Sequence, residues 1–179
     1  MKTFTQKHKY AFKPAKSNFK ALYKIEERRL RSFLPKSAKI EHIGSTAIPG
    51  LGGKGIIDIA LAAQKKDIQK IKKKLENKGY KHILSGGDKE RIFLQKDYKS
   101  KGKVRRIHIQ LTFHNSNTWR NAIALRDYLI KHKEAAEQYA QIKKKGAKIA
   151  KGKGKLYRKH KDAFIKRITK LALKEQKHE

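Results

Sequence analysis

Hydrophobic positions along this chain follow two different spacings, one typical of helices and one typical of strands. Five segments have apolar residues every three or four positions, as on one face of a helix. They are 17–34, 68–77, 117–130, 134–150 and 156–175. Five shorter segments have the continuous or alternating apolar pattern that indicates strands. They are 40–43, 55–61, 80–84, 91–96 and 104–113. The order α-β-β-α-β-β-β-α-α-α predicts an α/β (α+β) fold, in which helices pack on a mixed β-sheet and a helical C-terminal portion follows.

The 179 residues suit a single domain with a sizeable core. We expect the domain to cover residues 17–179, with its core at 17–115 and its helical C-terminal part at 116–179. A basic segment at 1–16 precedes it. The polar residues 97–103 are predicted to form a turn between the last two strands.

A turn rich in hydrogen-bond donors follows the first predicted strand. Gly44 breaks the strand at a point where a tight turn exposes backbone amides, and Ser45 and Thr46 add two hydroxyl groups. Amides and hydroxyls of this kind can converge on the oxygens of a phosphate group. An ordinary turn at the end of a strand is the alternative interpretation.

A single carboxylate interrupts the next apolar strand. Asp58 lies in the middle of a run that is apolar enough to be buried on both faces. Because an unpaired buried carboxylate is costly, we expect Asp58 to have a metal ion, an arginine or a cluster of donors as its partner. A structural ion pair fits the sequence equally well.

The predicted strand 104–113 alternates between two faces. Ile107, Ile109 and Leu111 fall on the face that we expect in the core, and His108 and Gln110 fall on the other. A strand with one face in water would show the same pattern. We predict instead that His108 faces the cleft that contains Asp58.

An arginine lies on the apolar stripe of the helix predicted at 117–130. Arg126 needs an anionic partner if this stripe faces the core. Either Asp127 or Glu134 supplies that partner, or Arg126 reaches the site and pairs with Asp58 or a phosphate group.

Composition adds one pronounced feature, a formal net charge of +33 from 48 Lys and Arg against 15 Asp and Glu. A positive field of this size predicts contact with nucleic acid, and the spread of the lysines over many segments favours nonspecific contact. The chain has no cysteine, which excludes disulfides and thiolate metal sites. Its apolar runs are too short to span a bilayer, so we expect a cytoplasmic protein without a membrane partner.

Several motifs together resemble the GrpB family, which is assigned to the nucleotidyltransferase-like (DNA-polymerase-β-like) superfamily. The core motif is His42-Ile43-Gly44-Ser45-Thr46-Ala47-Ile48-Pro49-Gly50-Leu51 with Lys54 and Ile57-Asp58-Ile59. The C-terminal pattern is Arg126-Asp127-Tyr128-Leu129, Tyr139-Ala140-Gln141-Ile142-Lys143, and Tyr157 with Lys161, Phe164 and Ile165. The resemblance covers roughly residues 15 to 172 and supports the predicted fold.

The resemblance implies transfer of a nucleotidyl group, or binding of a nucleotide or another phosphorylated small molecule. Asp58 would be the catalytic residue and would bind Mg²⁺. The residues that would hold the phosphates are Gly44, Ser45, Thr46, Lys54, Arg91, His108 and Arg126.

Two positions depart from the pattern that the resemblance implies. Ala60 stands where the superfamily usually has a second acid, and Gln110 stands where the family usually has a second histidine. One carboxylate holds Mg²⁺ weakly. A non-catalytic phosphate- or nucleotide-binding module and a basic RNA-associated protein therefore remain as alternatives.

Overall fold

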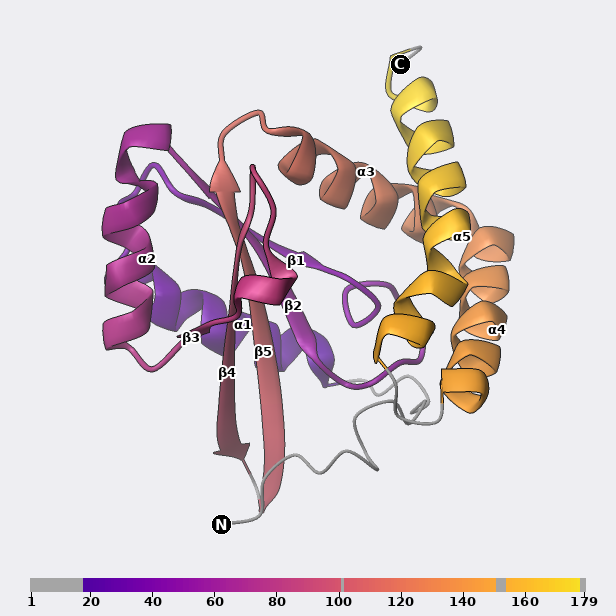
Figure 1. Cartoon of the computed structure of the whole chain (residues 1–179), viewed down its shortest axis with the longest axis horizontal. Coiled ribbons are helices and arrows are strands. Elements are labelled where there is room, and N and C mark those ends of the chain that lie inside the picture. Colours follow the sequence, from indigo (N-terminus) through magenta and orange to yellow (C-terminus); the bar gives the residue numbers. More distant parts are fainter. Residues whose placement is uncertain (1–17, 101, 151–153, 178–179) are drawn as a thin grey trace.

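Helices and strands follow one another in the predicted order. The structure is a computed structural model that describes residues 18–100, 102–150 and 154–177 (Figure 1). The helices are α1 (Phe19–Arg31), α2 (Ile68–Asn77), α3 (Asn117–Lys131), α4 (Lys133–Ala150) and α5 (Gly154–Glu175). The strands are β1 (Lys39–Ile43), β2 (Ile57–Ala63), β3 (Lys81–His82), β4 (Ile92–Ser100) and β5 (Lys103–Phe113). The segment predicted at 1–16 lies outside the described residues.

The strands form one mixed sheet in the order β1-β2-β5-β4-β3. The central pair, β2 and β5, is parallel, and the other pairs are antiparallel. Register in the central pair sets Asp58 opposite His108 and Ala60 opposite Gln110. Because neighbouring residues across a ladder point to the same side, these four side chains share one face of the sheet.

The main core lies on the opposite face, under α1 and α2. Ile107, Ile109 and Leu111 of β5 are fully buried there, as the alternation predicted. A second, smaller cluster joins the loop after β1 to the C-terminal helices. Its members are Ile48, Leu51, Leu129, Tyr139, Phe164 and Ile168. In Figure 1, α4 and α5 lie side by side on the far side of the sheet from α2.

Two predicted boundaries were wrong. Residues 97–100 continue β4, so the turn predicted at 97–103 is confined to the junction with β5. Asp97 stands opposite Arg106, whose guanidinium donates two hydrogen bonds of 2.7 Å to the carboxylate, and this cross-strand pair suits a polar sheet face. The strand predicted at 80–84 shrinks to Lys81–His82, because Leu84–Gly86 forms a 3₁₀ turn.

None of the described helices is both long and apolar enough to cross a membrane. The predicted fold class, a mixed sheet with packed helices and a helical C-terminal portion, is confirmed.

Candidate functional site

Asp58 and His108 form the centre of a polar cluster on the sheet face away from α1 and α2. His108 Nδ1 lies 3.0 Å from Asp58 Oδ1. An ionised carboxylate only accepts hydrogen bonds, so the imidazole is the donor. The predicted orientation of His108 toward Asp58 is confirmed.

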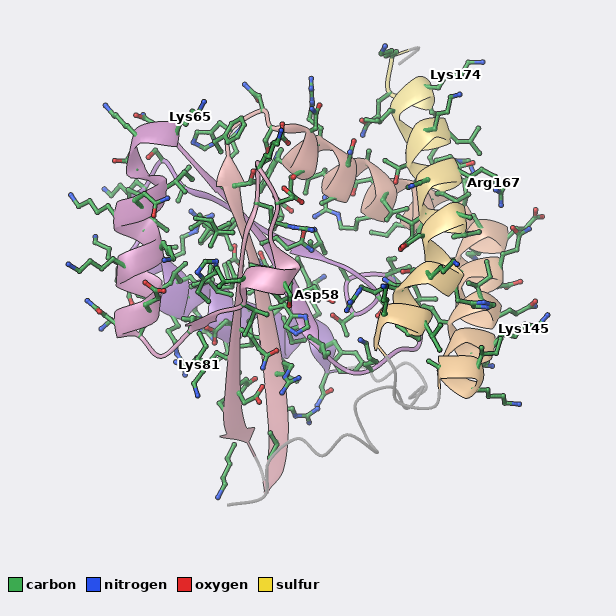
Figure 2. The ribbon with its side chains drawn as sticks, viewed as in Figure 1. Asp58, Lys65, Lys81, Lys145, Arg167 and Lys174 are labelled. Atoms are coloured by element: carbon green, nitrogen blue, oxygen red, sulfur yellow. The ribbon has the colours of Figure 1, made fainter. Side chains whose placement is uncertain are left out.

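The Asp58 carboxylate stays ionised at neutral pH. Burial raises its pKa, but the hydrogen bond from His108 and the charges of Lys54 and Lys161 outweigh this effect and hold the pKa below its ordinary value. The side chain is 25% exposed, so a small ligand can approach it from solvent. In Figure 2, Asp58 lies between the strands and the two C-terminal helices.

The turn after β1 lies directly against this carboxylate. Gly44 has a φ of +70°, and a Cβ at this position would lie 2.6 Å from Asp58 Oδ2. Glycine is therefore required both by the backbone angle and by the close approach. Ser45 lies farther along the turn, and its Oγ would be 2.5 Å from a Cβ placed on Gly53.

Two lysines reach the cluster from the C-terminal helices. Each follows a tyrosine by four positions, Tyr139 and Lys143 on α4 and Tyr157 and Lys161 on α5, so each pair shares a helix face. Lys143 is only 4% exposed. Its Nζ donates a 2.5 Å hydrogen bond to the carbonyl oxygen of Gly52, which ties α4 to the glycine-rich loop.

The two tyrosine rings help to hold the ammonium groups near one another. Lys54 Nζ lies 4.9 Å and Lys161 Nζ 5.9 Å from the centroid of the Tyr157 ring. Lys143 Nζ lies 5.2 Å from the centroid of Tyr139. Each contact of this kind contributes about 0.5–1 kcal/mol, which offsets part of the repulsion between the lysines.

Charge in the cluster is unbalanced. Lys54, Lys143 and Lys161 interact electrostatically with Asp58, so three amines surround one carboxylate. Burial is the largest cause that lowers the pKa of Lys143, the neighbouring charges of Lys161 and Lys54 add to it and Asp58 opposes them, and together they bring the pKa to about 7. A cluster of this composition favours an anionic ligand.

Thr46 has its hydroxyl proton committed within the protein. Thr46 Oγ1 donates to the carbonyl oxygen of Ile56 at 3.0 Å and lies 2.9 Å from His42 Nε2. The imidazole is therefore the donor in the second bond. The His42 ring stacks on Tyr23 with centroids 4.5 Å apart, and burial lowers its pKa to about 4.

Arg126 pairs with acidic side chains at the sheet edge. Its guanidinium donates to Glu41 Oε2 at 2.6 Å, to the carbonyl oxygen of His42 at 3.1 Å and to Asp127 Oδ1 at 2.7 Å. Asp127 is thus one of the partners that the sequence suggested, whereas the second carboxylate partner, Glu41, was not predicted. Arg126 and Thr46 both line a groove of about 630 Å³ between α1, residues 46–51 and α3.

Arg91 lies at the margin of the cluster. Its guanidinium donates to Gln110 Oε1 at 3.3 Å and forms an ion pair with Asp88 at 3.1 Å. Gln110 is two residues beyond His108 on β5, a spacing of about 7 Å along a strand. The structure therefore groups Gly44, Ser45, Lys54, Asp58 and His108, places Arg91 beside them, and places Thr46 and Arg126 at the neighbouring groove.

The donor set does not fit a resident Mg²⁺ ion. Asp58 is the carboxylate of the cluster, and one of its oxygens already accepts from His108. Among the described residues no group of three His, Cys, Asp or Glu side chains could hold a metal ion. The three surrounding amines would also repel a cation. Mg²⁺ prefers oxygen ligands in an octahedral arrangement, which this cluster does not supply.

The sequence interpretation missed Lys143 and Lys161 as site residues, although both stood in the C-terminal motif. A usable signal was present. Lys143 lies on the buried stripe of α4 with Tyr139, Gly146 and Ala150. The same reasoning that drew attention to Arg126, a cation on a core-facing stripe, applies to it.

Comparisons with known proteins agree with this architecture. The family model described as GrpB protein matches residues 10–171. The glutamate-rich protein GrpB of Alkalihalophilus pseudofirmus is 28% identical over 156 residues, which cover 84% of this chain and 88% of that protein. The UPF0157 protein PA4798 of Pseudomonas aeruginosa is 32% identical over 141 residues, and the match covers 78% of this chain but only 57% of that relative.

A solved structure of GrpB from Enterococcus faecalis superposes with a TM-score of 0.79 at 28% identity, covering 93% of this chain and 99% of that one. A chain of the GLD-2/RNP-8 complex superposes with a TM-score of 0.50 at 17% identity, covering 78% of this chain and 58% of that one, which shows a shared fold alone. The nucleotidyltransferase-like fold that the sequence resemblance implied is confirmed. This chain belongs to the GrpB family.

Proposed function

We propose that this protein binds a phosphorylated small molecule, with a nucleotide as the first candidate, beside the Gly44–Ser45 turn. The observation that carries the proposal is the imbalance of three amines around the single carboxylate of Asp58. Ammonium groups held together repel one another, and a bound phosphate would relieve that repulsion while accepting charge-assisted hydrogen bonds.

The residues divide into ligand contacts and supports. Ser45, Lys54 and Lys161 are partly exposed and can donate to a phosphate group. Lys143 is buried under Gly52 and Gly53, so its role is to position the loop and to add positive charge beneath it. Arg91, at the margin, would contact a longer phosphate chain.

We infer binding rather than nucleotidyl transfer. The residue two positions after Asp58 points to the same side of the sheet, where a second acid could share a metal ion. That residue is Ala60, and Gln110 faces it from β5. The polar face therefore offers the methyl group of Ala60, with the amide of Gln110 beside it, at the position where the transfer reaction would need a second carboxylate.

Calorimetry with pyrophosphate and ADP, in the presence of EDTA, tests the proposal. We expect both compounds to bind and adenosine not to bind, and a ligand at about 100 times its Kd to stabilise the fold by about 2.7 kcal/mol. The Lys161→Met variant should lose most of the affinity. Lys170→Met, at an exposed position on the same helix, removes the same charge and should bind normally. Absence of pyrophosphate binding, or equal losses in both variants, would contradict the proposal.

A second candidate function is nonspecific contact with nucleic acid. Basic side chains point outward from many elements, as Lys65, Lys81, Lys145, Arg167 and Lys174 do in Figure 2. A positive charge distributed in this way attracts phosphate backbones without selecting a sequence. This contact would use the outer surface and would leave the Asp58 cluster free.

A further inference from the structure

We propose that the Asp58 cluster selects ligands that end in a phosphate group and discriminates against phosphodiesters. This inference rests on the proposed function and specifies its ligand class. It is drawn from the charge of the cluster, from its enclosure and from the number of its donors.

Charge is the first argument. Three amines, those of Lys54, Lys143 and Lys161, face one carboxylate, so the fully protonated cluster carries an excess of two positive charges. A terminal phosphate carries about −1.5 to −2 at pH 7, whereas a diester carries a single negative charge. A terminal phosphate therefore balances the fully protonated cluster and holds the proton on Lys143, whose pKa is otherwise about 7, whereas a diester either leaves one positive charge without compensation or releases that proton.

Enclosure makes this difference matter. The side chains of His108 and Asp58 are 16% and 25% exposed, and the rings of Tyr139 and Tyr157 behind the lysines are buried. Charges at such positions are screened less by water and salt than charges on an open surface. An uncompensated charge here costs more than the same charge on an exposed lysine face.

The donors supply the third argument. Ser45 comes from the turn after β1, Lys54 from the glycine-rich loop and Lys161 from α5, so three partly exposed donors approach from three separate parts of the chain. A terminal phosphate offers three acceptor oxygens, and esterification of one of them removes a charged acceptor. A phosphodiester cannot satisfy the three donors with charged oxygens.

The inference separates small-molecule binding from nucleic-acid binding. Internal phosphates of DNA and RNA are diesters, so the cluster should not recognise them. Binding of nucleic acid should depend on exposed residues such as Lys145. A site variant such as Lys161→Met should lower the affinity for nucleic acid no more than Lys170→Met does.

Matched ligand pairs provide the test. AMP and 3′,5′-cyclic AMP share base and sugar but differ in the phosphate, and ethyl phosphate and diethyl phosphate form a smaller pair that avoids any clash with the base. Each compound is titrated against the full chain by calorimetry in EDTA, at constant ionic strength and about pH 7.5. We expect the terminal phosphate of each pair to bind at least about tenfold more tightly.

Protonation of the ligand gives an independent readout. At about pH 5 a terminal phosphate is largely singly charged, because its second pKa is about 6, so the preference should shrink toward equality. Lys161→Met should reduce the preference at about pH 7.5, and Lys170→Met should keep it. Equal affinities within both pairs, together with tight pyrophosphate binding, would overturn this inference and leave the proposed function standing. Failure of pyrophosphate and both terminal phosphates to bind would overturn the two together.

Discussion

Lys143 should make the stability of this fold depend on pH in a range where few groups titrate. Its ammonium is buried between Lys161 of α5, Lys54 and Gly52 of the loop and Asp58 of β2. Desolvation is the largest cause that lowers its pKa to about 7, from the ordinary 10.5, and the positive neighbours add to it. The attraction of Asp58 works in the opposite direction but is smaller.

The sign of the effect follows from the proton count. Between about pH 7 and 10.5, the unfolded chain holds a proton on Lys143 that the folded chain has released. Raising the pH in this range therefore favours the folded state, by about 1.4 kcal/mol for each unit. Between about pH 7.5 and 9, Lys143 should add about 2 kcal/mol to the free energy of unfolding.

Urea denaturation at several pH values, on the wild type and on Lys143→Met, measures this contribution. Methionine fills the same space without a titrating group. The free energy of unfolding of the wild type, relative to that of Lys143→Met, should therefore rise by about 2 kcal/mol between about pH 7.5 and 9. Other groups with shifted pKa values, such as Lys96, affect both proteins equally and cancel. Lys145→Met, on the exposed face of α4, is the control and should run parallel to the wild type. Parallel curves for Lys143→Met as well would refute the reasoning.

Three further outcomes are expected. Gly44→Ala should lower the free energy of unfolding by about 2–3 kcal/mol, because it combines backbone strain at positive φ with a contact against Asp58. Gly50→Ala is the control in the same denaturation assay: Gly50 has a φ of +74° and nothing within 4 Å of an added Cβ, so this variant should show the strain alone. Asp58→Asn should tighten pyrophosphate binding measured by calorimetry in EDTA, because it removes the carboxylate that opposes the ligand; a lower affinity of the variant in EDTA would refute this account of the charge balance. Acidification from about pH 6.5 to 4 should destabilise the wild type more than His42→Phe, because the lowered pKa of His42 means that the unfolded chain binds a proton there that the folded chain does not. Denaturation curves with equal acid sensitivity for the two proteins would exclude this account.

Local patterns were sufficient to predict most of the fold. The alternation of Ile107, Ile109 and Leu111 predicted both the strand and its buried face, because a side-chain period of two is read directly from the sequence. The boundary near Asp97 was wrong because polar residues usually indicate a turn, whereas here the ion pair with Arg106 stabilises strand pairing. That pairing partner is nine residues away, beyond any local pattern.

The site was only partly predictable, for a similar reason. Gly44 and Asp58 carry recognisable local signals, a tight turn and a charge in an apolar strand, and the structure brings them into contact. Lys143 and Lys161, which complete the cluster, lie on helices that begin more than 70 residues after Asp58. Only tertiary packing shows that these lysines converge on the carboxylate. Arg126 carried the same kind of signal, yet it pairs with its neighbour Asp127 and with Glu41 at the sheet edge rather than with Asp58.

The origin of its parts explains why the cluster depends on the C-terminal helices. The sheet contributes the turn, the carboxylate and the histidine, whereas α4 and α5 contribute two of the three amines. Ile48 and Leu51 pack against Tyr139 and Phe164 in the smaller apolar cluster. The loop between β1 and β2 is therefore held to the C-terminal helices by apolar contacts as well as by the hydrogen bond from Lys143 to Gly52. Without a bound anion, repulsion among the amines opposes the docking of α4 and α5. A bound anion attracts the amines and therefore reinforces the docking. Ligand binding and docking of the helices should therefore be thermodynamically coupled, so that a phosphate ligand protects the amides of α4 and α5 from hydrogen exchange more than it protects those of α2.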